Sequence, residues 1–309
     1  MHAPKHGHVT RMALRYFVLD VFSDQPYAGN PLAVVLDADA LHTRQMQRIA
    51  REFNLSETVF VQAPTCEEAL ARARIFTPNK ELPFAGHPTV GTACLLAELG
   101  LAPQGEDVSF VLDEAVGPVP VRVVRREGFP SFGQLSVAQL PVYGPDAPPV
   151  EVLAAMLGLK TQDILAEPAG PRSVSCGVPY LMVPLCSPEV LASVSFDLVL
   201  WREHLSKAWA DHVLVYARGQ EDDWRLRMFA PGSGVMEDPA TGSAAVALAG
   251  ALASENGERS GSWSWLMQQG LEMGRPSKLY AEADKRDNQV CAVRVGGHSV
   301  RVLEGKLLY

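Results

Sequence analysis

The chain has 309 residues, 47% hydrophobic and 20% charged, which is enough for two globular domains with substantial cores. Its formal net charge of −8 and its lack of a Lys/Arg-rich run argue against partners such as nucleic acid or an anionic membrane surface. Its five cysteines show no C-x-x-C spacing, and no apolar run approaches the ~18 residues of a membrane span, so we expect a cytoplasmic protein with reduced thiols.

The first half of the chain opens with a polar stretch that lacks the apolar middle of a signal peptide, so residues 1–12 are predicted to be a disordered extension. Thr43–Phe53 has apolar residues at helical spacing, and Asn54 is suited to end that helix. Glu57 follows, just before a strand, where the backbone can aim its side chain into a cleft. Pro88–Glu98 is predicted to be a buried helix. Strands are predicted at Tyr16–Asp20, Leu32–Leu36, Thr58–Val61, Ala71–Phe76, Val108–Leu112 and Val119–Val124.

The middle of the chain is rich in turn-forming residues. Gly128–Gly133 and the proline-rich segment Pro141–Pro149 place a domain boundary near the midpoint. We therefore predict an N-terminal domain over 13–130 and a C-terminal domain over 131–309, whose last strand can pair back to the first domain. The second half has a predicted helix at Val150–Leu157 and predicted strands at Tyr180–Pro184, Val213–Tyr216, Arg225–Phe229, Lys278–Ala283, Cys291–Val295 and Val300–Leu303.

The most informative stretch is Val235–Ala245, where two acids precede a proline and a Thr-Gly-Ser turn leads into an alanine-rich run. This run reaches about Ala253 with almost no polar face, which predicts a second buried helix. Pro239 suits the first helical position, and Asp238 before it suits the N-cap. Such a helix start presents free backbone N–H groups and a partial positive charge, which favour a substrate carboxylate.

An internal duplication relates this stretch to Phe84–Ala93. Aligning the two places His87 on Asp238. Further matches, in the same order and at nearly the same offset, pair Arg74–Pro78 with Arg227–Pro231, and Gly29–Leu32 with Gly177–Tyr180. Such a pattern indicates two similar domains that face each other, with a cleft between the N-termini of two buried helices.

The usual signals of cofactor binding are missing from the sequence. It contains no phosphate-binding loop, no complete dinucleotide fingerprint, no paired zinc-ligand spacing and no nucleophile elbow. We therefore expect chemistry that uses neither a cofactor nor a metal.

The duplication would instead bring four polar side chains to one cleft. They are Glu57, His87, Asp238 and Ser243. Each alone could be structural, as a solvated loop residue, a helix-start histidine, a helix cap or an ordinary first-turn serine. Together they suit proton transfer next to a conjugated carboxylate, which needs a base near the carbon and donors for the developing charge. A glutamate in a water-poor cleft could have its pKa raised towards neutrality.

The chain resembles the phenazine-biosynthesis PhzF-like family from about Leu14 to the C-terminus. The motifs that carry the resemblance are Tyr16–Phe22, Gly29–Val34, Met46–Glu57, Arg74–Pro78, Glu81–Pro88, Glu237–Ala245 and Gly270–Ser277. The resemblance implies two α/β domains, each a curved β-sheet wrapped around a central buried helix, as in diaminopimelate epimerase and proline racemase. It also implies a homodimer and no cofactor.

The resemblance assigns roles to single residues as well. The glutamate of the N-L-S-E motif is the family's acid/base, which implies this role for Glu57. The histidine of A-G-H-P and the aspartate and serine of E-D-x-A-T-G-S-A position the family's substrate, and glycine at a helix start leaves the backbone N–H groups accessible. Substrate binding is therefore predicted for Gly86, His87, Asp238, Gly242 and Ser243.

We expect a cofactor-independent isomerase of a small carboxylate-bearing metabolite, in which Glu57 takes a proton from carbon and returns it elsewhere on the same conjugated system. One alternative is a racemase in which Glu57 and Asp238 act on opposite faces. Another is a non-catalytic metabolite-binding or scaffold protein. A two-thiol mechanism, as in the related epimerases, is disfavoured because none of the five cysteines lies at a matching catalytic position.

Overall fold

The computed structural model describes residues 13–308 apart from 168 and 220–222, so the expected extension at 1–12 lies outside the described residues. The strands are β1 (Ala13–Val21), β2 (Asn30–Val35), β3 (Glu57–Gln62), β4 (Ala71–Phe76), β5 (Glu81–Leu82), β6 (Asp107–Glu114), β7 (Gly117–Val124), β8 (Ser131–Ser136), β9 (Val142–Asp146), β10 (Arg172–Ser175), β11 (Pro179–Pro184), β12 (His212–Arg218), β13 (Trp224–Ala230), β14 (Val235–Asp238), β15 (Gly261–Gln269), β16 (Ser277–Arg286) and β17 (Gln289–Leu308). The helices are α1 (Thr43–Phe53), α2 (Gly86–Glu98), α3 (Val150–Leu157), α4 (Pro188–Ala192), α5 (Leu198–His204) and α6 (Gly242–Glu255).

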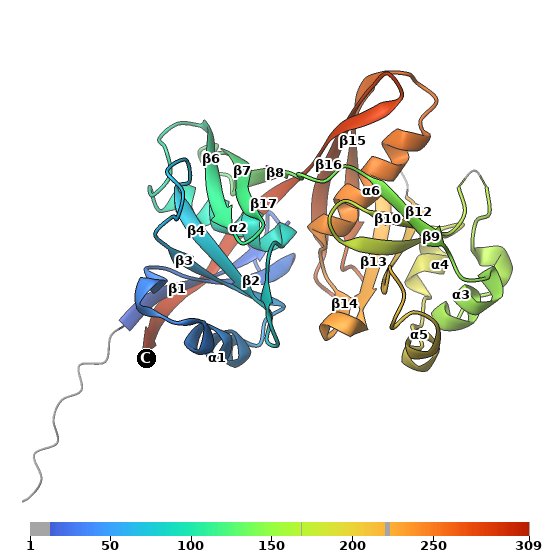
Figure 1. Cartoon of the computed structure of the whole chain (residues 1–309), viewed down its shortest axis with the longest axis horizontal. Coiled ribbons are helices and arrows are strands. Elements are labelled where there is room, and N and C mark those ends of the chain that lie inside the picture. The colour runs from blue at the N-terminus through green and yellow to red at the C-terminus, as the bar shows by residue number, and fades with distance from the viewer. Residues whose placement is uncertain (1–12, 168, 220–222, 309) are drawn as a thin grey trace, which may run out of the picture.

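The two halves of the chain repeat one pattern of strand pairing. In the first half β2 and β4 run parallel to β3 and β6, while β3–β4, β6–β7 and β7–β8 are antiparallel. In the second half β11 and β13 run parallel to β12 and β15, while β12–β13, β15–β16 and β16–β17 are antiparallel. Each curved sheet wraps around one helix, α2 or α6 (Figure 1). The predicted fold of two pseudo-symmetric halves, each with a central buried helix, is confirmed.

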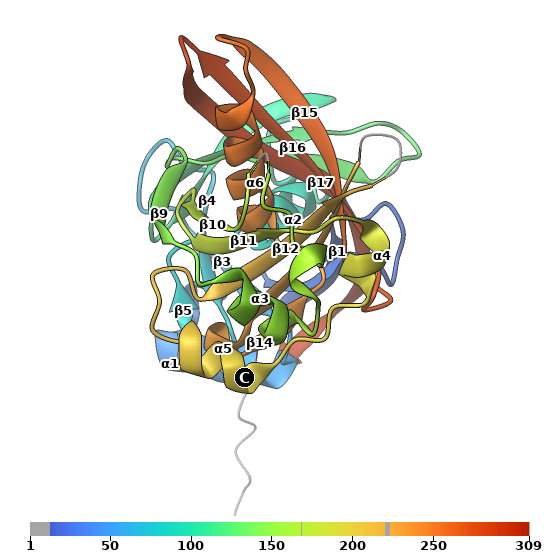
Figure 2. The same cartoon turned by 90° about the vertical axis from the view of Figure 1, so that its right-hand side faces the viewer.

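The halves are joined by an exchange of strands. The long strand β17 pairs with β16 and β8, and its C-terminal part then pairs with β1. In the reciprocal direction, β9 leaves the first half and pairs with β10 of the second. Figure 1 shows β17 crossing from one half to the other, and Figure 2 shows the same strand with the second half turned towards the viewer. Because β8 pairs with β7, we propose that the boundary lies between β8 and β9, a few residues beyond the expected position at 130.

The position of each helix relative to the hydrophobic core explains why α2 and α6 are apolar on all sides. Both central helices are almost entirely buried in the largest hydrophobic cluster, in which Leu95 of α2 and Val246 of α6 are fully buried. The outer helices bury only one face. In α1 that face carries Met46 and Ala50, while α3, α4 and α5 cover the outside of the second sheet around a separate cluster.

The structure confirms the prediction of the helix that rests on local sequence patterns. The helix Thr43–Phe53 has the predicted bounds and ends at Asn54, whose φ of 52° is left-handed. One prediction about the second buried helix is wrong. Asp238 is the last residue of β14, paired with Met228, and α6 begins only at Gly242 with Thr241 as its N-cap. The proline after Asp238 disfavours helical backbone there, which is consistent with the extended conformation.

Candidate active site

The two central helices meet at their N-termini, and this contact forms the floor of a cavity between the halves. A methyl group added to Gly86 would lie 3.3 Å from the Cα of Gly242 and 3.3 Å from the backbone nitrogen of Ser243. The structure therefore pairs Gly86 with Gly242, and His87 with Ser243. The alignment that placed His87 on Asp238 is corrected by five residues.

The cavity has a volume of about 260 Å³, which suits a small metabolite. Neither helix start is capped by a side chain, because the N-cap residues Ala85 and Thr241 make no side-chain cap hydrogen bond. The first turn of a helix has no internal partners for its N–H groups, so both starts can bind a carboxylate. The lining includes all six predicted site residues, Glu57, Gly86, His87, Asp238, Gly242 and Ser243.

Glu57 and His87 form the chemically most distinctive pair in this cavity. Glu57 begins β3, and its Oε2 lies 3.4 Å from Nε2 of His87 in the first turn of α2. Both atoms are buried, and neither has a hydrogen-bond partner within the described residues. Burial, reinforced by the negative charge of Asp238, raises the pKa of Glu57 to about 8. Burial lowers the pKa of His87 to about 3, so its imidazole is neutral.

Asp238 is held by hydrogen bonds from both halves of the molecule. Asn30 donates from Nδ2 to Oδ1 over 2.9 Å, and Thr241 donates from Oγ1 to Oδ2 over 2.6 Å. Gln269 extends this network, because its Nε2 donates to the Asp238 carbonyl over 2.7 Å. Burial raises the pKa of Asp238 to about 6, while the two side-chain hydrogen bonds oppose the rise. Asp238 is therefore mainly ionised at neutral pH, unlike Glu57.

Three of the cavity residues that sequence reasoning missed carry polar groups that a ligand could contact, namely Tyr180, His212 and Lys80. The buried Tyr180 hydroxyl lies 2.6 Å from Oγ of Ser243 and stabilises that side chain at the start of α6. His212 and Lys80 also line the cavity. Of these three, only Tyr180 could have been found from the sequence, because it ends one of the duplicated motifs. Lys80 lies in a turn and His212 begins a strand, and the sequence patterns there predict backbone structure but not a site.

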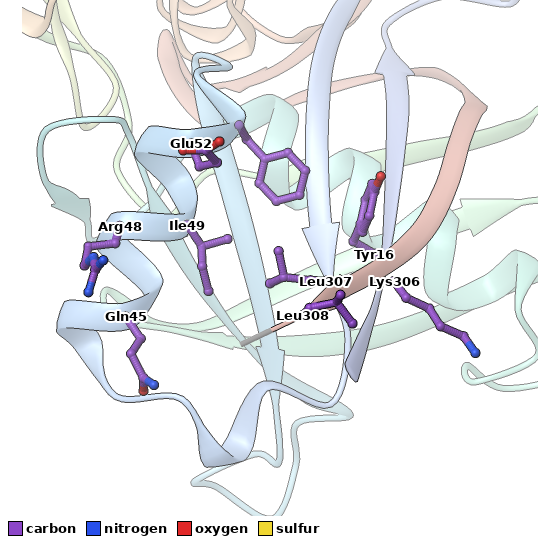
Figure 3. Close-up of a pocket in the computed structure, with 9 residues that line it drawn as sticks. Tyr16, Gln45, Arg48, Ile49, Glu52, Lys306, Leu307 and Leu308 are labelled. Carbon is purple, nitrogen blue, oxygen red and sulfur yellow. The ribbon is translucent and has the colours of Figure 1, made fainter. Parts of the chain in front are cut away.

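A larger hollow of about 590 Å³ lies on the outside of the first half, between α1 and the end of β17 (Figure 3). Ile49 and Leu307 lie between the helix and the strand there. None of its lining side chains has a buried polar atom without a partner, and it contains no predicted site residue. We therefore place the site in the smaller cavity.

Within residues 13–308, leaving aside 168 and 220–222, no group of three or more His, Cys, Asp or Glu side chains is arranged to hold a metal ion. In the same part of the chain, no helix combines the length and apolarity that crossing a bilayer requires.

Replacing Asp238 by asparagine is expected to lower the pKa of Glu57, because the substitution removes the negative charge that adds to the effect of burial. The titration midpoint should fall below about 8 but stay above the ordinary 4.5, since the carboxyl remains buried. The measurement is a ¹³C-detected NMR titration of the Glu57 carboxyl. Glu237→Gln is the control, because that acid is paired with Arg227 at 2.8 Å. An unchanged midpoint in Asp238→Asn would show that the two carboxyls do not interact.

Comparison with known proteins identifies the family. The model of the phenazine biosynthesis-like protein family matches residues 19–305. An uncharacterised isomerase of Mesorhizobium japonicum is 43% identical over 298 residues, covering 94% of this chain and 98% of that protein. The trans-2,3-dihydro-3-hydroxyanthranilate isomerase of Pseudomonas aeruginosa is 39% identical over 296 residues, covering 94% of this chain and 98% of the relative.

Solved structures agree with this match. A PhzF-family protein of Bacillus anthracis aligns with a TM-score of 0.85 and 27% identity, covering 96% of this chain and 100% of the other. A hydroxyproline epimerase of Agrobacterium vitis shares the fold, with a TM-score of 0.64 and 12% identity, covering 96% of this chain and 92% of that one. The chain therefore belongs to the phenazine biosynthesis-like protein family and is an enzyme of the isomerase class.

Proposed function

We propose that the protein is a cofactor-independent isomerase that moves a proton within a small carboxylate-bearing metabolite, with Glu57 as the acid/base. The observation that carries this proposal is the Glu57–His87 pair. Two buried, unpartnered polar atoms face each other over 3.4 Å in a cavity, and the pKa of the carboxyl is about 8. A buried polar group without a partner costs free energy, so such a pair in a native cavity points to a ligand that completes it.

The geometry supports a simple proton relay. The substrate carboxylate binds the N–H groups at the starts of α2 and α6, which also stabilise the charge that develops on it. The ionised form of Glu57, which is the minor form at neutral pH because the pKa is about 8, removes a proton from a carbon conjugated with that carboxylate and becomes neutral. His87, which is uncharged, can then accept a hydrogen bond from the protonated Glu57. The same carboxyl returns the proton to another carbon of the conjugated system, so the substrate and the enzyme regain their original proton counts.

The racemase alternative requires a second base. Asp238 is the nearest candidate, but both of its oxygens already accept hydrogen bonds, from Asn30 and Thr241. This occupancy suits a positioning role more than proton abstraction, and it favours a single base at Glu57.

Isotope transfer tests the proposal. A substrate deuterated at the labile carbon and converted in ordinary water should keep some deuterium in the product, because Glu57 returns the atom it took before exchange with water is complete. Complete loss of label with inversion of a stereocentre would favour two bases. Absence of any exchange across a broad panel of acids would favour the non-catalytic metabolite-binding or scaffold protein.

The substrate class follows from the same argument. The Pseudomonas aeruginosa relative is named for an amino acid that carries a carboxylate, and we propose a small conjugated acid as the substrate of this site. Screening carboxylates for thermal stabilisation of the protein would find candidates.

A homodimer and a cytoplasmic location stay predictions, and sedimentation equilibrium of the purified chain would test the first.

A further inference from the structure

Two turns, one from each half, meet at the cavity that contains the Glu57–His87 pair. Residues 77–80 connect β4 to β5, and the turn between β13 and β14 approaches from the opposite half. The hydroxyl of Thr77 accepts a hydrogen bond from the N–H of Lys80 over 3.0 Å and lies 3.1 Å from its carbonyl oxygen, which fixes the backbone of Lys80. A methyl group added to Gly234 would lie 3.1 Å from Nδ2 of Asn79, so the two turns are in contact.

Lys80 is an exposed cation that lines the cavity, and within the described residues no carboxylate pairs with it. The neighbouring cations on the same two hairpins are neutralised, since Arg74 pairs with Glu81 at 2.7 Å and Arg227 pairs with Glu237 at 2.8 Å. The positive charge of Lys80 is therefore available to a ligand in the cavity.

His212 lines the same cavity as Lys80. Its Nε2 is 3.0 Å from Oγ of Ser233, while its Nδ1 is buried without a hydrogen-bond partner in the described part of the chain. Burial lowers the pKa of His212, opposed by Asp211 and assisted by the charge of Lys80. A chain of contacts links the two residues: Ser233, whose hydroxyl lies 3.0 Å from His212, precedes Gly234, and the Gly234 turn contacts Asn79, the neighbour of Lys80.

We propose that Lys80 and His212 bind a second acidic group of the substrate, so that the site selects small dicarboxylates over monocarboxylates. The inference rests on the proposed function, because it assigns the first carboxylate to the helix starts. An exposed ammonium group without a carboxylate partner can form a charge-assisted hydrogen bond with a ligand carboxylate, and a neutral imidazole can donate a second one. Asp211, whose Oδ1 lies 3.8 Å from Nε2 of His212, does not line the cavity. Nδ1 of His212 therefore remains available to hydrogen-bond a ligand.

The test compares benzoate with isophthalate, which differ by one carboxylate. Wild-type protein should bind isophthalate about tenfold more tightly by calorimetry, as expected for one charge-assisted hydrogen bond from an exposed lysine. Lys80→Gln should bring the two affinities to within about twofold by weakening only isophthalate, and Lys80→Arg should keep the preference. Lys207→Gln removes the same charge from an exposed position outside the cavity and should behave like wild type.

The outcomes separate this inference from the proposed function. Glu57→Gln should keep the preference for isophthalate, because recognition of a second acid needs no proton transfer. A Lys80-dependent preference without any isotope transfer would support the recognition of dicarboxylates and overturn the isomerase. Equal binding of the two probes by wild-type protein, no binding of either, or an unchanged preference in Lys80→Gln would overturn the recognition, whatever the isotope experiment gives.

Discussion

Glu57→Gln is expected to reduce turnover by roughly 10²- to 10⁴-fold, the usual contribution of a general acid/base, while ligand affinity changes only a few-fold. Glutamine keeps the shape of the side chain but cannot exchange a proton with carbon. The measurement is kcat and KM on the substrate found by the acid screen. Glu52→Gln, an exposed position of α1, is the matched control and should keep wild-type activity. Wild-type turnover by Glu57→Gln would remove this residue from the mechanism.

The same substitution should stabilise the fold, and the gain should grow with pH. The pKa of Glu57 is about 8 in the folded protein, against an ordinary value of 4.5. Between these values the folded state keeps a proton that the unfolded state has lost, so stability from this group is fully present below 4.5 and is lost as pH rises through about 8.

Glutamine cannot ionise and escapes this loss. Glu57→Gln should therefore match wild type near pH 4 and exceed it by about 2 to 4 kcal/mol in free energy of unfolding near pH 8.5. Urea unfolding at the two pH values, extrapolated to water, measures the difference. Equal stabilities near pH 8.5 would mean that the carboxylate is well solvated. A gain in stability together with lost turnover is the relation expected of a strained catalytic group.

Gly86→Val is the second change with a large expected effect. Its added carbon atoms would press on the backbone of Gly242 and Ser243, which lie 3.3 Å from the position of a single added methyl group. Backbone cannot move aside as a flexible side chain can, so the two helix starts must separate. We expect a loss of about 1–3 kcal/mol of stability, the usual cost of overpacking.

Carboxylate binding should weaken at least about tenfold in Gly86→Val, because the anion site depends on the N–H groups of both helix starts. Gly257→Val is the matched control, since a side chain there would meet nothing within 4 Å. Thermal unfolding and calorimetry with the acids of the screen give the two readouts. Unchanged affinity in a folded Gly86→Val protein would refute carboxylate binding at the helix starts.

Several features of this protein were determined by the sequence alone. Apolar spacing and a following Asn54 define α1 with its observed bounds, because capping and one-sided burial are local properties. The two all-apolar runs identify the central helices, since only a surrounding sheet can bury every side of a helix. Repeated motifs at nearly one offset predict the two similar halves, and the residues that they contain include Glu57 and His87.

The tertiary structure alone decided how the site is completed. Asp238 looked like a helix cap, but Asn30, 208 positions earlier, donates to its carboxylate in the observed position, where it ends a strand. Lys80 and His212 come from opposite halves, and no local pattern reveals that they line one cavity. The reason is physical. Helix and strand formation depends on residues a few positions apart, whereas a cavity between two halves is formed by side chains that only the packing of the halves brings together.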